Sequence, residues 1–396
     1  MLSGKVIESG PRASTQHVVR VGALLVAVSA GTNVPVPLLL VHQQQLGLTD
    51  EQTAGLFGVY AIGLIPAVLV AGAMTDRWGA RRVVLTAGLV AALISTGFAL
   101  AGSSVVALFA LRAVQGGAAG AVFVSASVWI QQLLATRGPG RGARVAAVCM
   151  SGGFAGGSLV AGLWGEWWPW PVLAPYLIHA GACALIAWWT AVGVPAARVA
   201  SDGSRAMRGP VIRSGARRRA LLVVAPPALF VFGFPATAIN AVPLVVGLPV
   251  AAVAVTGGLA ALTLGSGAVV STWQARLRER AVPMAGLLGA IGMALTAAAT
   301  VNESAKLLLV PAVIALGSGG GLALSGGLAR IPDVVAPGRA GTATAGFYAI
   351  AYLGFGIPIL VTRATAHLAP EFSFLILGGF CVVVWLAQRP RPTFTV

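Results

Sequence analysis

The chain has 396 residues, of which 57% are hydrophobic and only 9% are charged, and its formal net charge is +16. Soluble domains carry about a quarter charged residues, and one soluble core rarely grows past roughly 250–300 residues, so these values exclude a water-soluble domain and favour a lipid-embedded chain. The basic residues form short clusters between hydrophobic runs, as membrane topology signals do, which argues against nucleic acid as a partner.

Twelve hydrophobic runs follow one another along the chain, and a membrane-spanning helix needs about 20 such residues. Backbone groups in lipid must hydrogen-bond within their own segment, and the runs are too long for barrel strands, so we predict an all-α membrane protein. A cleaved signal peptide ending near Ala30 is an alternative for the first run, although that run continues to Val41. The predicted spans cover residues 18–41, 53–75, 83–101, 105–130, 143–164, 172–193, 219–242, 251–272, 282–301, 306–329, 341–362 and 371–388.

The distribution of basic residues predicts the orientation of these spans. If the N-terminus is cytoplasmic, all lysines and arginines except Arg112, Lys306 and Arg363 fall in the inner loops and tails. Positive charge is retained on the cytoplasmic side of a membrane. We therefore predict a multi-pass protein of the inner (plasma) membrane with both termini in the cytoplasm.

The chain divides into two related six-helix halves. Pro139-Gly140-Arg141 recurs 198 residues later as Pro337-Gly338-Arg339, each time before the fifth span of a half, as a parallel repeat predicts. Segment 196–218 is rich in Arg, Ser and Gly, so we predict a flexible linker that is also suited to anionic lipid headgroups. The predicted parts are a cytoplasmic tail at 1–17, a six-helix bundle at 18–195, the basic linker at 196–218, a second bundle at 219–388 and a cytoplasmic tail at 389–396.

The loop between the second and third spans reads Gly72-Ala-Met-Thr-Asp76-Arg77-Trp-Gly79-Ala80-Arg81-Arg82. Gly72 allows a close helix approach, and Gly79 allows an unusual turn. Asp76 can accept hydrogen bonds from a helix N-terminus, while the arginines hold the loop at the inner surface. A positive-inside turn whose acid offsets its basic neighbours explains the spacing equally well.

The fourth span contains a charge. An arginine inside a span costs at least about 2.5 kcal/mol, so Arg112 must face a cavity or a partner. It could bind a substrate anion, control a nearby proton carrier, or be held by helix carbonyls. Gln115 lies one turn away on the same face, where it could line the same polar patch or pack helices.

Both segments resemble signatures of the major facilitator superfamily. The loop is similar to GxxxDRxGxRR, with Ala80 where a basic residue is common, and Leu111–Ala119 is similar to RxxQGxxxA. The resemblance extends to helix count, loop polarity and half-repeat. It implies two bundles around a central cavity that opens alternately to each side. It also implies a cytoplasmic gate contact made by Asp76 and Arg77, and a link between Arg112 and proton coupling. The conformational switch would comprise Gly72, Asp76, Arg77, Gly79, Arg81 and Arg82.

The fifth span carries Gly153-xxx-Gly157-Ser158-xxx-Gly162, which partly resembles a signature of drug antiporters of that family. Ser158 stands where the signature has proline, and glycine-mediated helix packing also explains the run. At its outer end, Glu166 sits among four tryptophans, which form an interfacial belt or, alternatively, a gate or aromatic substrate site.

Other polar residues of the spans are candidates for substrate or proton contacts. None of the ten acidic residues falls in the middle of a predicted span, so a proton carrier would have to be another group, such as His179, whose alternative role is neutral packing. Asn33 with Pro35 and Pro37 interrupts the first span, and Asn240 with Pro243 interrupts the seventh. Such breaks indicate binding sites or simple kinks. Tyr348 and Tyr352 of the eleventh span could face either the cavity or lipid.

The sequence contains no enzyme signature, and we expect no cofactor and no metal site. We predict a secondary active transporter that works by alternating access, as a monomer, and exports a small drug-like or secondary metabolite with protons as the coupling ion. One alternative is uptake of a small anionic metabolite with Arg112 as charge clamp. A second alternative is a membrane receptor or scaffold that does not transport.

Overall fold

The computed structural model describes residues 15–101, 104–194, 211–213, 215–216, 224–242, 245, 253–301, 303–365 and 367–388. In this part of the chain, eleven helical segments are long and apolar enough to cross a membrane, and a shorter apolar helix, Ala225–Ala241, takes the place of the predicted seventh span. The predicted all-α fold is confirmed. Residues 1–14 of the predicted N-terminal tail, the predicted C-terminal tail, most of the predicted linker, residues 219–223 and Pro243 lie outside the described residues.

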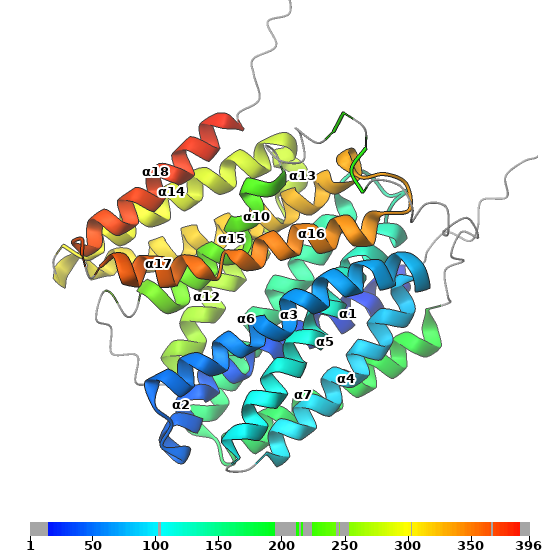
Figure 1. The fold of residues 1–396 in the computed structure, drawn as a ribbon, viewed down its shortest axis with the longest axis horizontal. Helices are drawn as coiled ribbons and strands as arrows, with labels where there is room; N and C mark the ends of the chain where they lie inside the picture. Colours follow the sequence, from blue (N-terminus) through cyan, green and yellow to red (C-terminus); the bar gives the residue numbers. More distant parts are fainter. Residues whose placement is uncertain are drawn as a thin grey trace, which may run out of the picture.

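The helices gather into two groups that follow the chain (Figure 1). The N-terminal half contains α1 (Thr15–Asn33), α2 (Pro35–Leu46), α3 (Asp50–Trp78), α4 (Ala80–Leu100), α5 (Val105–Leu133), α6 (Arg141–Trp167) and α7 (Leu173–Gly193). The C-terminal half contains α10 (Ala225–Ala236), a π-helical turn (Thr237–Ala241), α12 (Val253–Ser271), α13 (Gln274–Leu277), a 3₁₀ turn (Arg278–Arg280), α14 (Ala281–Ala299), a 3₁₀ turn (Glu303–Leu308), α15 (Leu309–Val334), α16 (Ala340–Leu353), α17 (Gly356–Ala364) and α18 (Pro370–Ala387).

Within the described residues, three of the predicted spans are interrupted. The first is divided into α1 and α2 at Val34, as the asparagine and prolines predict, because Pro35 lacks the N–H that would continue the helical ladder. The seventh passes from α10 into the π-helical turn. The eleventh is divided into α16 and α17 between Leu353 and Gly356, a break that the sequence does not predict.

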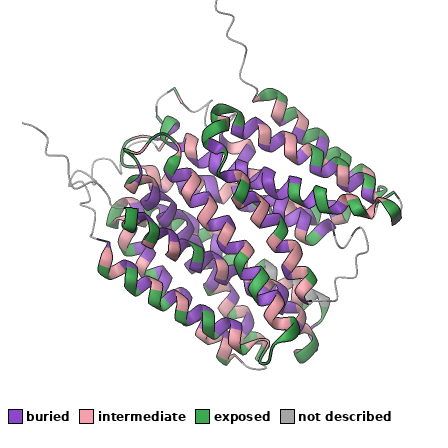
Figure 2. Ribbon diagram, turned by 180° about the vertical axis from the view of Figure 1, so that it is seen from behind, coloured by how far each residue is buried: buried purple, intermediate pink, exposed green. Residues whose placement is uncertain are grey.

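Large apolar side chains cover the outer surface of the bundle. Leu93, Ile62 and Val192 are each more than 70% exposed, which water would penalise and lipid accepts. Figure 2 shows the buried positions where helices meet and the exposed positions on the outward sides of the peripheral helices. This arrangement is that of a protein whose outer solvent is the bilayer.

The two halves meet at two helix contacts. Helix α3 packs against α16, and α6 packs against α12 and α15. Glycine makes the approach possible at both contacts. A Cβ on Gly72 would lie 2.5 Å from the Ala345 Cβ, and a Cβ on Gly162 would lie 2.9 Å from the Gly257 Cα. Small residues at helix crossings allow backbones in a membrane to come this close.

Four basic loops gather at one end of the bundle, which we call the arginine-rich face. These loops lie against one another through three contacts, which pair Arg330 with Glu279, Asp76 with Gly341, and Gly140 with Gln274. The loops contain residues 77–82, 137–144, 276–280 and 330–339. We call the other end of the bundle the opposite face.

Candidate functional site

The carboxylate of Asp76 joins the two halves at the arginine-rich face. Its Oδ1 accepts a hydrogen bond of 2.7 Å from the Gly341 N–H. Its Oδ2 accepts bonds of 2.9 Å and 2.6 Å from the N–H and the hydroxyl of Thr342. Helix α16 has no side-chain cap of its own, so these first-turn amides would otherwise lack acceptors. Asp76 therefore supplies the missing cap, and the helix dipole favours its negative charge.

Glycine at two positions allows this contact. A Cβ on Gly341 would lie 2.6 Å from the Asp76 Oδ1 and 2.5 Å from the Gly72 carbonyl oxygen, so no larger residue fits there without displacement. Gly79 has a φ of 84°, which ends α3 and lets α4 begin at once. Gly72 and Gly79 were predicted from the sequence, but Gly341 and Thr342 were not, because nothing in the sequence links them to a loop so far away.

The three arginines of the loop have different surroundings. Arg77 and Arg82 are exposed. Arg81 instead turns back into its own half, where its Nη2 donates to Ala191 O at 2.7 Å and its Nε donates to Val194 O at 2.9 Å. These are carbonyls at the C-terminal end of α7, whose partial negative charge attracts a cation. Arg81 thus caps α7 rather than reaching the other half.

Tyr348 and Tyr352 of α16 both lie in the protein interior, with exposed fractions of 0% and 3%. The Tyr348 hydroxyl forms a hydrogen bond of 3.0 Å with the Ser127 hydroxyl of α5, so it joins the halves a second time. The Tyr352 ring stacks on Phe232 of α10 with centroids 4.3 Å apart. Neither tyrosine faces lipid.

Arg112 lies deep in the N-terminal half, with 3% of its surface exposed. Its Nη1 donates to Gln115 Oε1 at 2.7 Å, and its Nε donates to Leu56 O at 3.2 Å. The guanidinium also lies 4.8 Å from the centre of the Tyr60 ring. Every hydrogen-bond acceptor that the described residues give to Arg112 is neutral, so its positive charge faces carbonyls, an amide and an aromatic ring.

The break in the first span creates the acceptors for this cluster. In a continuous helix the N–H of residue 35 would bond to Gly31 O, but Pro35 has no N–H. Gln115 Nε2 donates to that freed carbonyl at 2.8 Å. Arg112 Nη1 donates to the neighbouring Thr32 O at 3.4 Å. The interruption that the sequence predicts thus places backbone oxygens beside the buried charge.

His179 lies on the other side of the same stretch of α1. Its Nε2 is 2.8 Å from Ala27 O, and its Nδ1 is 2.7 Å from the Ser95 hydroxyl. Because a carbonyl can only accept, we assign the proton to Nε2 and let Nδ1 accept from Ser95. A cavity of about 10 Å³, room for about one water molecule, lies between His179 and Gln115.

The two asparagines do not join this cluster. Asn33 Nδ2 donates to Phe154 O of α6 at 3.3 Å. Asn240 is exposed in the π-helical turn, and its Nδ2 donates to Ala236 O of its own segment at 3.0 Å. Tyr60, in contrast, belongs to the cluster and was missed, since a tyrosine within an apolar run has no distinguishing pattern.

A second carboxylate joins the halves at the opposite face. Glu166, at the end of α6, accepts a hydrogen bond of 3.2 Å from the Ala254 N–H in the first turn of α12. The tryptophans beside it are 50–69% exposed at positions 167, 168 and 170, which suits an interfacial belt. The glycine run of α6 packs against α1 at Gly153 and Gly157, so close helix packing uses these glycines.

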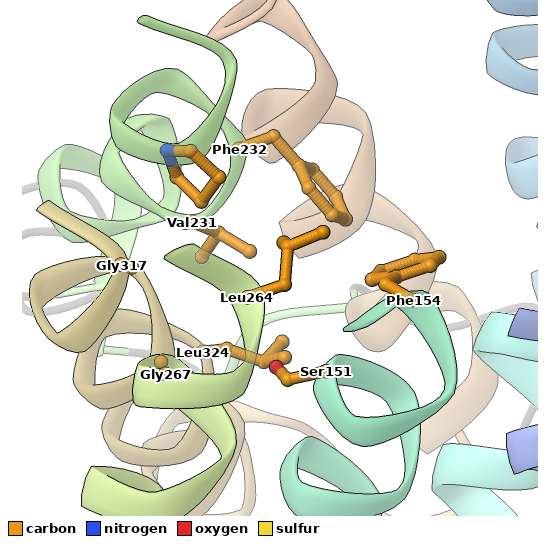
Figure 3. Close-up of a pocket in the computed structure, with 11 residues that line it drawn as sticks. Ser151, Phe154, Val231, Phe232, Leu264, Gly267, Gly317 and Leu324 are labelled. Carbon is orange, nitrogen blue, oxygen red and sulfur yellow. The ribbon is translucent and has the colours of Figure 1, made fainter. Parts of the chain in front are cut away.

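An apolar cavity lies between the halves, enclosed by α6 on one side and by α10, α12 and α15 on the other (Figure 3). Phe154 and Phe232 line it from opposite halves and form an edge-to-face contact, with ring centroids 6.2 Å apart and planes at 67°. Ser151 contributes a hydroxyl to the wall. The free volume of the cavity is about 10 Å³, enough for about one water molecule. A drug-sized ligand needs about 300 Å³ or more, so the halves must separate before one can enter.

Comparison with known proteins places this geometry in context. The family model of the Major Facilitator Superfamily matches residues 21–357. The probable transporter SCO4007 of Streptomyces coelicolor is 33% identical over 169 residues, which are 41% of this chain and 36% of that protein, so the chain matches only about a third of the length of this relative. The crystal structure of FucP, a transporter of the same superfamily in the outward conformation, superposes with a TM-score of 0.68 at 16% identity, covering 94% of this chain and 97% of that chain.

Proposed function

The chain belongs to the major facilitator superfamily, and we propose that it is a secondary transporter that exports apolar compounds with flat aromatic rings across the plasma membrane. The observation that supports this cargo is the cavity between the halves, whose walls are glycines, aliphatic side chains and two phenylalanine rings, with Ser151 as the one polar side chain. Aromatic rings pack well against offset or perpendicular aromatic partners. Such a cavity favours apolar cargo over sugars or ions.

Alternating access is proposed to use the two carboxylate contacts as its gates. Asp76 holds α16 at the arginine-rich face with three hydrogen bonds, and Glu166 holds α12 at the opposite face with one. With both contacts formed, the cavity has room for about one water molecule. Release of one contact at a time would open the cavity to one side of the membrane, with the arginine-rich face in the cytoplasm.

Protons are the proposed coupling ion, and His179 is the proposed carrier. Its neighbour Ser95 can rotate its hydroxyl, so Nδ1 can gain a proton and become a donor without moving the ring. The water-sized cavity beside it leads to Gln115, which bonds to Arg112. A proton on His179 would place a second positive charge near Arg112, which would favour a rearrangement of this cluster.

Transport in vesicles tests the proposed cargo. Purified protein in inverted proteoliposomes with an acidic interior should accumulate Nile red, a neutral planar aromatic dye. Phe232→Leu, which keeps an apolar side chain but removes the ring, should reduce the apparent affinity several-fold. Phe380→Leu is the matched control, since Phe380 is 47% exposed on the outer surface. An equal effect of both changes, or no accumulation of any aromatic dye, would contradict the proposal.

Uptake of a small anion is a second candidate because the buried charge of Arg112 meets only neutral acceptors within the described residues. Arg112→Lys keeps the charge but loses the planar fork, so it should weaken anion transport less than Arg112→Ala. If both variants carry carboxylates as the wild type does, Arg112 does not bind the cargo.

A further inference from the structure

The end of the predicted linker is paired with the loop that leads into α16. Ile212 and Val335 form an antiparallel β-bridge. The two flanking main-chain bonds are 2.9 Å long and run from the Arg213 N–H to Val334 O and from the Ala336 N–H to Val211 O. Over these residues, the linker is anchored rather than flexible. We call residues 211–213 the strap.

The strap has a side-chain anchor as well. The Arg213 Nε donates to Val335 O at 2.6 Å. Val335 is the extended residue directly after α15, and the turn that follows contains Gly338 with a φ of 75°. Helix α16 begins two residues later, at Ala340. The strap therefore fixes the strand of chain immediately before the amides that Asp76 binds.

The other described end of the linker region also reaches this gate. Val194 directly follows α7, and its carbonyl accepts from Arg81. Arg81 lies five residues after Asp76 in the same loop. The two sides of the gate contact are thus each bonded to one end of the segment that joins the halves. The Asp76 loop is bonded through Arg81, and the chain that leads into α16 is bonded through Arg213.

We propose that Arg213 is a positioning residue for the gate, and that the strap holds the start of α16 in the geometry that Asp76 requires. This rests on the proposed gating role of the Asp76 contact. The amides of Gly341 and Thr342 can bond to one carboxylate only if α16 begins at a fixed point and angle. The loop before α16 is held by three hydrogen bonds to the strap, so its backbone is already ordered before the halves meet. Closure therefore costs less conformational entropy. Loosening the strap should therefore favour the state in which the arginine-rich face is open.

Distance measurements between spin labels test this without any substrate. Maleimide-linked labels are placed at Thr136 and Ala275, which are exposed at the arginine-rich face in opposite halves, in a chain whose three native cysteines are replaced by alanine. Arg213→Ala removes the side-chain bond, and Arg213→Pro also removes the main-chain donor. A hydrogen bond of this kind shifts an equilibrium by about three- to tenfold. The population with the long distance should rise about threefold in the first variant and about tenfold or more in the second.

Arg363→Ala is the matched control, because it removes one positive charge at an exposed site of α17, far along the chain from the strap. It should leave the distances unchanged.

An Ile212→Cys/Val335→Cys disulfide provides the opposite change, since bridged antiparallel residues lie within disulfide range. Oxidation should leave only the short distance between the two spin labels, and reduction should restore the long-distance population. Unchanged distances in folded Arg213→Pro, or in the oxidised disulfide variant if Arg213→Pro does not fold, would overturn the proposal. Because the readout is a distance, failed dye export does not affect it.

Discussion

Asp76 accepts a hydrogen bond of 2.7 Å from the Gly341 amide, although 265 residues separate them in the chain. One residue at the end of α3 thus caps the first turn of a helix in the other half. The bond to the charged oxygen is of the stronger, charge-assisted kind. Closure at the arginine-rich face therefore depends on the charge of Asp76 and on the small size of Gly341, and each can be changed separately.

Asp76→Asn should open the arginine-rich face. Asparagine keeps the shape of the side chain but loses the charge and one acceptor oxygen, and hydrogen bonds to charged groups contribute about 1.5–3 kcal/mol each. We expect the closed state to lose about 2 kcal/mol or more. The label pair at Thr136 and Ala275 measures this loss as a larger long-distance population, and a distribution equal to wild type would show that the carboxylate does not hold the gate.

Gly341→Ala should impair transport through size alone. The added methyl group would meet Asp76 and Gly72, and overpacking costs about 1–3 kcal/mol. Gly346→Ala is the control on the same helix, since a Cβ there meets nothing within 4 Å. Both changes favour helix formation by about 1 kcal/mol. Dye transport should fall at least tenfold in the first variant and stay within about twofold in the second. Equal rates would mean that the close approach is not needed.

Glu166→Gln should have a smaller effect than Asp76→Asn. Its bond to Ala254 is single, longer at 3.2 Å, and exposed to solvent, and exposed charge interactions contribute about 0.2–1 kcal/mol. Turnover should change less than about fivefold. Glu371→Gln removes an acid from the first turn of α18 and serves as the comparison. A loss as large as that of Asp76→Asn would show that the opposite face is the stronger gate.

His179→Gln should separate proton coupling from transport. Glutamine can still donate to Ala27 O and accept from Ser95, so the packing of α1 is retained, but it does not take up a proton near neutral pH. Accumulation driven by a pH gradient should disappear, while exchange of labelled for unlabelled dye should persist. If the variant still accumulates dye against its gradient, the proton is carried elsewhere.

Much of the fold follows from composition because lipid imposes strict rules. Long apolar runs must be helices in a bilayer, and the positions of arginine indicate the loops that share one face. The break at Pro35 was predictable from a missing N–H. The break between α16 and α17 was not, because Gly354 meets the Leu229 carbonyl of another helix and only packing reveals that contact.

The site was predictable only in part. The loop sequence singled out Asp76, and helical spacing placed Gln115 beside Arg112. Their distant partners, Gly341 and Gly31, are a glycine amide and a glycine carbonyl, and backbone groups carry no sequence signal. Arg81 shows the reverse problem, since its place among the gate arginines suggested a role between the halves while its bonds lie within one half.

Labelling of the cavity from each side of the membrane tests the proposed cycle most directly. Ser151 lines the cavity and is 6% exposed, so Ser151→Cys in the cysteine-free chain reports access to it. A membrane-impermeant maleimide is applied to the arginine-rich face or to the opposite face of sealed vesicles. We predict slow labelling from the arginine-rich face that becomes at least tenfold faster with Asp76→Ala. Labelling at equal rates from both faces, unaffected by Asp76→Ala, would contradict a cavity that this contact closes.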